Sequence, residues 1–208
     1  MNILILSTSD TGGAANACMR LHEGLIQTNV SSKVLVIQQK KRIPEVYNFL
    51  DIYKPRTLLK RLLKAPRVLH FKRKQNRLKK GRSIREMYST IDSLHDVTRH
   101  PLYKWADIIN IHWVVNFLDY TSFFRKNTKP VVWTLHDMFL FTGGNHYEKG
   151  FPFDQYKESI TEQISQKKLL FKDKPFTIVS PSTWLFNLAK KHQHMYLSQQ
   201  VCLHPKLL

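Results

Sequence analysis

The stretch NILILSTSDTGGAANACMRLHEGLIQTNVSSKVLVIQ, residues 2–38, decides the fold of this chain. Residues 2–7 form a compact apolar run, which is typical of a strand buried on both faces. Gly12 and Gly13 predict a tight turn, residues 14–27 a helix, and residues 33–38 a second strand. This order of elements opens a doubly wound α/β domain. The dinucleotide fingerprint G-x-G-x-x-G is absent, and a bare glycine pair is also compatible with a plain turn.

The rest of the chain continues the alternation of strands and helices. Strands are predicted at residues 107–113, 130–135, 176–180 and 200–204. Helices are predicted at residues 118–126 and 158–171, and from a cap at Ser182 to about residue 191. Six strands alternating with helices predict one Rossmann-like, doubly wound and mostly parallel sheet in a single domain over residues 1–208.

Composition excludes several classes of protein. Of the 208 residues, 42% are hydrophobic, which is enough for a packed core. The two cysteines, Cys18 and Cys202, are too few for a disulfide framework, and Cys18 is expected to pack inside the first helix. No apolar run approaches the roughly 18 residues that span a bilayer, and the N-terminus lacks the basic region of a signal peptide. We therefore expect a cytoplasmic protein.

Most of the positive charge lies in one segment. The chain has 33 Lys and Arg against 15 Asp and Glu, and 14 of the basic residues fall between Lys54 and Arg85, where there is no acidic residue. Leucines at helical spacing predict a basic amphipathic helix in this arm, about residues 54–86, interrupted at Pro66. Its basic side chains include Lys60, Arg61, Lys64, Arg67, Lys72, Arg73 and Lys74.

Three readings of the basic arm remain open. Such a helix suits an anionic membrane surface, where each nearby basic residue adds about 1 kcal/mol of binding. It is also compatible with a solvated arm whose leucines pack on their own domain. Nucleic acid is the least favoured partner, because the chain has neither zinc-finger spacing nor an RNP-type aromatic motif.

Three loops are expected to form a site. In parallel α/β sheets, ligands bind at the carboxyl ends of the strands, and the loops at residues 8–16, 112–116 and 136–147 follow strands there. Glycine turns expose backbone N–H groups that suit phosphate or sugar hydroxyls, and Trp and Tyr offer faces for sugar rings. The predicted edge gathers two Gly-Gly turns with His112, His136, Asp137 and His146, and Trp113 lies nearby.

The histidines each have alternative interpretations. His136, directly after a strand, is predicted to bind substrate, but Asp137 beside it is also compatible with a loop cap that binds backbone N–H groups. His112 is compatible with partial burial beside Trp113. No H-E-x-x-H or Cys/His spacing supports a metal site built from His112, His136 and His146, and no metal is expected. The G-x-S-x-G elbow of serine hydrolases is absent.

Four segments together resemble a known family. The segments TGGAANACMRLHEGL, DIINIHWVVNFLD, PVVWTLHDMFLFTGGNHY and TIVSPSTWL are similar, in order and spacing, to family 4 glycosyltransferases of the GT-B fold. The nearest group is the bacterial enzymes of capsule, lipopolysaccharide O-antigen and colanic acid assembly. The resemblance extends from residue 1 to about residue 191. It implies an N-terminal domain that mainly binds the acceptor and a C-terminal domain that binds the sugar nucleotide, with retaining, metal-independent transfer.

The resemblance also implies roles for individual residues. Gly12 and Gly13 would lie near the donor phosphates and the acceptor, and His136 would be the catalytic residue near the reacting carbon of the donor sugar. The basic arm would meet a lipid-linked or glycan acceptor at the inner face of the cytoplasmic membrane. The same substrate pocket would be shaped by Asp137, Thr142, Gly143 and Gly144. Independently of the resemblance, Asn16, His112 and His146 are candidate substrate-binding residues because they lie in the three loops expected to converge.

Two departures from the family set further expectations. Asn145 stands where relatives of this type carry a cysteine. The chain ends near the point where the family enters its donor-binding domain, so we expect a truncated protein that is not active alone. A separate donor-domain chain would complete the site, because the leaving diphosphate needs charge stabilisation. The alternative hypothesis is a non-catalytic module that binds a membrane or a glycan carrier.

Overall fold

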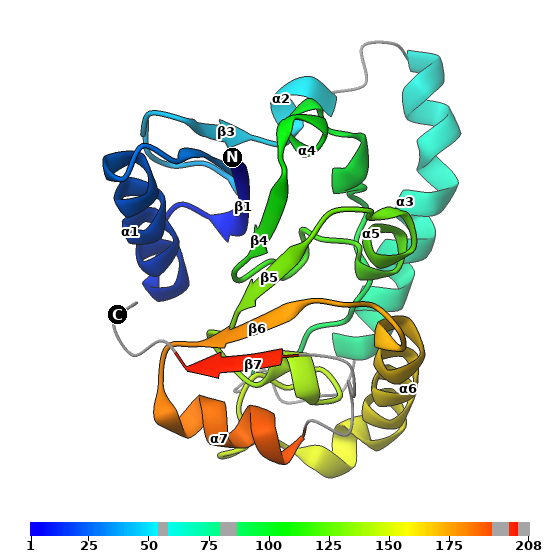
Figure 1. The fold of residues 1–208 in the computed structure, drawn as a ribbon. Helices are drawn as coiled ribbons and strands as arrows, with labels where there is room; N and C mark the ends of the chain where they lie inside the picture. The colour runs from blue at the N-terminus through cyan, green and yellow to red at the C-terminus, as the bar shows by residue number, and fades with distance from the viewer. Residues whose placement is uncertain (54–57, 80–86, 193–199, 204–208) are drawn as a thin grey trace.

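The computed structural model describes residues 1–53, 58–79, 87–192 and 200–203. Within these residues, seven strands form one sheet, and every neighbouring pair is parallel. The strands are β1 (Asn2–Ser9), β2 (Ser31–Gln38), β3 (Val46–Asn48), β4 (Ile108–Ile111), β5 (Val131–Thr134), β6 (Thr177–Ser180) and β7 (Gln200–Leu203). Their order across the sheet is β3-β2-β1-β4-β5-β6-β7 (Figure 1). The Rossmann-like α/β fold predicted from the sequence is thereby confirmed.

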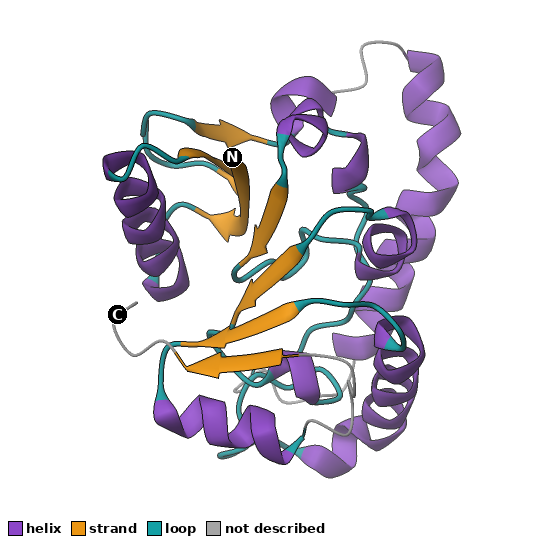
Figure 2. Cartoon of the chain, viewed as in Figure 1, coloured by secondary structure: helices purple, strands orange, loops and turns teal. Residues whose placement is uncertain are grey.

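Helices cover both faces of this sheet (Figure 2). The described helices are α1 (Gly13–Gln27), α2 (Leu50–Tyr53), α3 (Leu58–Lys79), α4 (Pro101–Trp105), α5 (Tyr120–Lys126), α6 (Phe153–Phe171) and α7 (Thr183–Lys191). Single 3₁₀ turns stand at Val97–Arg99 and Phe139–Phe141. Figure 1 shows α1 on one side of the sheet and α5 and α6 on the other. Every predicted strand and helix is present with shifted ends, whereas β3, α2 and α4 were not predicted.

Alternation of side chains along β1 builds a core on each face of the sheet. Ile3 and Ile5 pack with Cys18 of α1, while Leu4 and Leu6 point the other way, into the larger aromatic core. Burial raises the pKa of the Cys18 thiol to about 12, so this cysteine is packed and unreactive, as predicted.

Side-chain caps fix where two helices near the site begin. Asp119 accepts the backbone N–H of Ser122 at 2.8 Å, which starts α5 two residues later than predicted. Ser182 accepts the backbone N–H of Leu185 at 3.3 Å, and this confirms the predicted cap of α7.

The helix α6 is longer than predicted, because it begins at Phe153 rather than at residue 158.

The predicted interruption at Pro66 is wrong, since α3 continues through it as one helix of 22 residues. Proline lacks the N–H that would bond the carbonyl four residues earlier, and its ring crowds that carbonyl. The loss is local, however, and the leucine, lysine and arginine residues on either side are all good helix formers. The helix therefore tolerates the proline within its length.

The second half of α3 packs on the domain. Lys74 Nζ lies 2.5 Å from Asp92 Oδ2, and Gln75 Nε2 donates to Thr90 Oγ1 at 3.2 Å. Lys74 is therefore directed at the domain, whereas Lys72 and Arg73 are exposed. Other parts of the predicted arm lie outside the described residues: the segments 54–57 and 80–86, and the side chains of Lys60, Arg61, Lys64 and Arg67. Among the helices described, none combines the length and the apolar character needed to cross a bilayer.

Candidate functional site

A cleft opens at the carboxyl ends of β1, β4 and β5. The chain leaves β1 toward β2 on one side and returns to β4 on the other, so the direction of winding reverses at this point. The cleft has a volume of about 530 Å³. It is lined by the loop after β1, by Trp113 after β4, and by His136, Asp137, His146 and Tyr147 after β5. The expected convergence of the three loops is therefore confirmed.

Backbone and side-chain hydrogen bonds hold the first loop in place. The backbone N–H of Thr8 donates to the carbonyl of Trp113 at 2.7 Å, and Thr8 Oγ1 donates to the carbonyl of Val115 at 2.8 Å. On the other side, the buried carboxylate of Asp10 accepts the backbone N–H groups of Lys40 and Lys41, the latter at 2.6 Å. These bonds connect the end of β1 to the loop after β4, and the loop after β1 to the loop after β2.

The first glycine pair forms an open wall of the cleft, as predicted. A Cβ atom added to Gly12 or Gly13 would meet nothing within 4 Å, so a ligand can approach this backbone closely. Gly12 has a φ of 105°, in the region that favours glycine, and no side chain caps the N-terminus of α1. Asn16, in the first turn of α1, is exposed and is not among the lining residues.

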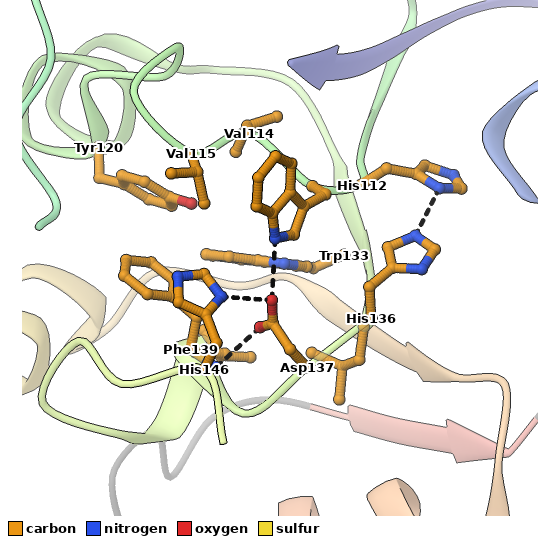
Figure 3. A pocket seen from close by; sticks show the side chains of 12 residues that line it. His112, Val114, Val115, Tyr120, Trp133, His136, Asp137, Phe139 and His146 are labelled. Carbon is orange, nitrogen blue, oxygen red and sulfur yellow. Dashed lines mark hydrogen bonds and ion pairs between the residues drawn. The ribbon is translucent and has the colours of Figure 1, made fainter. Parts of the chain in front are cut away.

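Asp137 is the hydrogen-bonding centre of the opposite wall (Figure 3). Its Oδ2 atom accepts from Trp113 Nε1 at 2.9 Å and contacts His146 Nδ1 at 2.5 Å, while Oδ1 accepts the backbone N–H of Phe139 at 2.9 Å. Burial alone would raise the pKa of the Asp137 carboxyl, but the hydrogen bonds and the charge of His146 outweigh it and lower the pKa below its ordinary value. Asp137 is thus a buried carboxylate that fixes the indole of Trp113, and it also makes the loop-cap bond considered from the sequence.

Ser89, His146 and Asp137 form a hydrogen-bonded line that the sequence did not predict. Ser89 Oγ lies 2.9 Å from His146 Nε2, while His146 Nδ1 contacts Asp137. This is the order of groups in a serine-hydrolase triad. Ser89, however, is 6% exposed and does not line the cleft, and its backbone is pinned by a hydrogen bond to Gly144. The Ser89 hydroxyl is therefore not presented to the cleft, and its hydrogen bond holds His146 in place beside Asp137.

His112 and His136 form a second pair, between the ends of β4 and β5. His112 Nδ1 lies 2.9 Å from His136 Nε2 (Figure 3). Burial, and then the neighbouring His136, lower the pKa of His112 to about 3. Burial lowers the pKa of His136 to about 4, although Asp137 acts in the opposite direction. Both imidazoles are therefore neutral at pH 7, and His136 is the member that faces the 530 Å³ cleft.

The second glycine pair supports the site from behind and does not line the cleft. A Cβ on Gly143 would lie 2.6 Å from the backbone Cα of Ile160 in α6, and a Cβ on Gly144 would lie 2.5 Å from the carbonyl oxygen of Ser89. Thr142 is also buried, and its Oγ1 donates to the carbonyl of Asn145 at 2.5 Å. These residues therefore pack beneath the cleft without lining it, and their role in shaping a substrate pocket stays a prediction.

Two buried polar side chains of α6 hold the site loops. Gln163 Oε1 accepts the backbone N–H of Ile91 at 3.1 Å. One turn later, Lys167 Nζ donates to the backbone carbonyls of Phe139 and Thr142. Lys167 is 1% exposed; burial lowers its pKa to about 7, although the charge of Asp137 acts in the opposite direction. These residues were not predicted, because the side chains of Gln and Lys in a helix are normally exposed to solvent.

The three histidines considered as metal ligands do not gather. His146 directs both ring nitrogens to Asp137 and Ser89, while His112 and His136 bond each other. Within the part of the chain that the structure describes, no three His, Cys, Asp or Glu side chains form a metal-binding group.

Further lining residues were missed by sequence reasoning. Met87 and Tyr147, each 49% exposed, stand at the cleft beside Trp113. Tyr147 ends the loop at residues 136–147, which the sequence placed at the site, and that position was the available signal. Met87 carried no signal, because it reaches the cleft through a tertiary contact in which its carbonyl accepts the backbone N–H of His146.

Comparison with known proteins assigns no family. No protein-family model matches the chain, and no curated protein matches it at a significant level.

Proposed function

We propose that this chain is the acceptor-side domain of a retaining, sugar-nucleotide-dependent glycosyltransferase of bacterial surface-polysaccharide assembly. One observation carries the proposal: the Gly12–Gly13 turn and His136 lie on the same cleft, although more than 120 residues separate them. The cleft stands where the winding of the sheet reverses, which is the usual position for ligands in this architecture. The resemblance to family 4 glycosyltransferases names both elements as parts of one substrate site.

The first wall of the cleft suits phosphate or sugar hydroxyls. The first N–H groups of α1 have no intrahelical acceptor, and the N-terminal end of a helix carries a partial positive charge. The hydroxyls of Ser9 and Thr11 lie beside these groups, 3.1 Å from each other. Because Gly12 and Gly13 leave open space, an oxygen-rich ligand can reach the backbone itself.

The opposite wall suits the ring of a sugar. Trp113 and Tyr147 present aromatic surface to the cleft, and the hydrogen bond to Asp137 holds the indole in one orientation. Aromatic rings pack against the C–H faces of sugars, while the polar edge of the sugar remains free for hydrogen bonds. His136 stands on the same wall and supplies a polar group beside the aromatic surface.

The proposed reaction needs a second half. Transfer from a sugar nucleotide releases a diphosphate whose charge must be stabilised. Among the described residues that line the cleft there is no lysine and no arginine. We assign this task to a donor-binding domain outside this sequence, on the same chain or on a separate partner. The nucleotide sugar is then a substrate, and the resemblance implies no resident metal.

Deletion of the gene in the source cells tests the proposal. We expect the surface polysaccharide to change in composition, and wild-type protein to restore it while His136→Ala does not. Glu158→Ala, at an exposed position of α6, is the matched control and should restore it fully. Circular dichroism must show that both variants fold. Unchanged polysaccharide after deletion, or full rescue by His136→Ala, would overturn the proposal.

A second candidate function is a non-catalytic module that binds an anionic membrane or a glycan carrier. The favouring observation is the exposure of Leu69, Lys72 and Arg73 on α3. An apolar residue beside two cations matches the requirements of an anionic bilayer surface. In the glycosyltransferase proposal, the same surface would hold the enzyme peripherally at the inner face of the cytoplasmic membrane, next to a lipid-linked acceptor.

A further inference from the structure

The bond between His112 and His136 contains a single proton, and its position decides what His136 offers to a ligand. The two nitrogen atoms lie 2.9 Å apart, and the ring centroids lie 5.0 Å apart. Two neutral imidazoles joined in this way leave two arrangements. Either His112 donates from Nδ1 to His136, or His136 donates from Nε2 to His112.

The far side of His112 distinguishes the two arrangements. His112 is 3% exposed, and within the described residues its Nε2 atom is buried and meets no hydrogen-bond partner. If His136 were the donor, His112 would carry its own proton on Nε2, and this N–H group would be buried without an acceptor. If His112 is the donor, Nε2 carries only an unshared electron pair. Buried N–H groups without an acceptor are rarer in native proteins than acceptors without a donor.

We propose that His112 is a positioning residue that donates its Nδ1–H to His136 Nε2 and thereby fixes the proton of His136 on Nδ1. Within the described residues, the bond to His112 is the single hydrogen bond of the His136 side chain, so Nδ1 remains available to the cleft. His136 then presents an N–H donor to an oxygen atom of the ligand. Its lone pair is engaged by His112, so His136 is not a general base in this state.

The assignment of the protons and the assignment of the ligand depend on different evidence. The tautomers of the two histidines follow from the pair itself and do not depend on the proposed function. The assignment of the accepted oxygen to a sugar or phosphate group rests on the proposed function. A measurement of the tautomers therefore separates the two.

Nitrogen NMR of the full chain with ¹⁵N-labelled histidine tests the proposal at pH 7. Long-range ¹H–¹⁵N correlation identifies which ring nitrogen carries the proton, and His112→Asn and His136→Asn supply the assignments. We expect protonated Nδ1 and bare Nε2 in both rings. A proton on Nε2 of His136 in the wild-type protein would overturn the proposal.

Two substitutions distinguish positioning from simple packing. His112→Asn places an amide donor near the position of Nδ1 and should leave the His136 proton on Nδ1. His112→Leu fills the space without a donor, and His136 should then shift toward the Nε2–H tautomer that free imidazole side chains prefer. If His136 keeps its tautomer in a folded His112→Leu protein, His112 has only a packing role. Failure of sugars to bind, with the expected tautomers in place, would contradict the proposed function alone.

Discussion

The Nδ1 atom of His146 lies 2.5 Å from Oδ2 of Asp137, and the indole of Trp113 donates to the same carboxylate oxygen. One carboxylate thus connects the end of β5 to the aromatic wall of the cleft and to the loop that carries His146. The pair is buried, with the Asp137 side chain 11% exposed and that of His146 1% exposed. The negative charge of the Asp137 carboxylate is consequently stabilised by the hydrogen-bond donors around it rather than by water.

Asp137→Asn should destabilise the fold and loosen Trp113. The amide keeps the shape of the side chain but turns an N–H group toward donors that need an acceptor. Leaving a buried donor unsatisfied costs about 1–3 kcal/mol, and we expect a loss of this size in urea unfolding. Glu158→Gln, at an exposed position, is the control and should change stability by less than about 0.5 kcal/mol. Equal stability of the two variants would contradict this role for Asp137.

The two glycine pairs should respond differently to alanine. Gly143→Ala forces a Cβ to 2.6 Å from the backbone of Ile160, and we expect a loss of about 1–3 kcal/mol in the free energy of unfolding. Gly13→Ala meets open space at a position with ordinary φ, so stability should hold or rise by up to about 1 kcal/mol. Ligand binding in the cleft should weaken in Gly13→Ala, because the methyl group blocks approach to the backbone. Parallel effects of the two substitutions on stability would refute the distinction.

The buried histidine pair predicts a loss of stability in acid. The pKa values of His112 and His136 in the folded protein, about 3 and about 4, lie below the ordinary value of 6.5. As the pH falls below 6.5, the unfolded chain takes up protons that the folded chain does not. The contribution of each histidine is thus fully present above pH 6.5 and decreases by about 1.4 kcal/mol per pH unit until the folded-state pKa is reached.

Urea unfolding at pH 7 and pH 5 measures this effect. The double variant His112→Asn/His136→Asn should lose less stability between these two pH values than the wild-type protein does. If the variant and the wild type lose the same amount, the two histidines are not buried as neutral groups.

The exposed basic side chains of α3 should determine any binding to membranes. We expect co-sedimentation with vesicles that contain phosphatidylglycerol and weaker binding to pure phosphatidylcholine. Lys72→Gln/Arg73→Gln should lower the affinity for anionic vesicles by about thirtyfold, since each cation near the surface contributes about 1 kcal/mol. Lys168→Gln/Lys172→Gln removes two exposed cations elsewhere and is the control. Equal binding to neutral and anionic vesicles would argue against an electrostatic contact.

The fold was predictable because the arrangement of strands in the sheet follows from short sequence patterns that each predict one strand or helix. The apolar run that became β1 and the helix after Gly13 are strong, adjacent signals, and parallel strands with short loops have few alternative arrangements. The strand β3 was missed because it has only three residues at the edge of the sheet, and α4 because it has only five. The continuation of α3 through Pro66 was missed because proline opposes helix locally, whereas its neighbours favour one.

The position of the site was predictable from the sequence, but the hydrogen bonds and packing contacts within it were not. His136, Gly12 and Gly13 were found from their places after strands. The packing roles of Gly143 and Gly144 were not predicted. A sequence shows that these residues lack a Cβ atom, but it does not show which neighbouring atoms a Cβ would clash with. The contacts of His146 with Ser89 and of Lys167 with the carbonyl of Phe139 connect residues 57 and 28 positions apart. Such contacts form only when the chain folds, so the spacing of residues along the sequence does not predict them.

Saturation-transfer NMR of the full chain with a panel of sugar nucleotides and methyl glycosides measures whether the cleft binds a sugar. We expect that at least one sugar receives saturation from the protein, and that His136→Ala and Gly13→Ala weaken the signal while Glu158→Ala does not. Absence of binding by every member of the panel to the folded wild-type protein would contradict the proposed function. Binding that is unchanged in both His136→Ala and Gly13→Ala would contradict it equally.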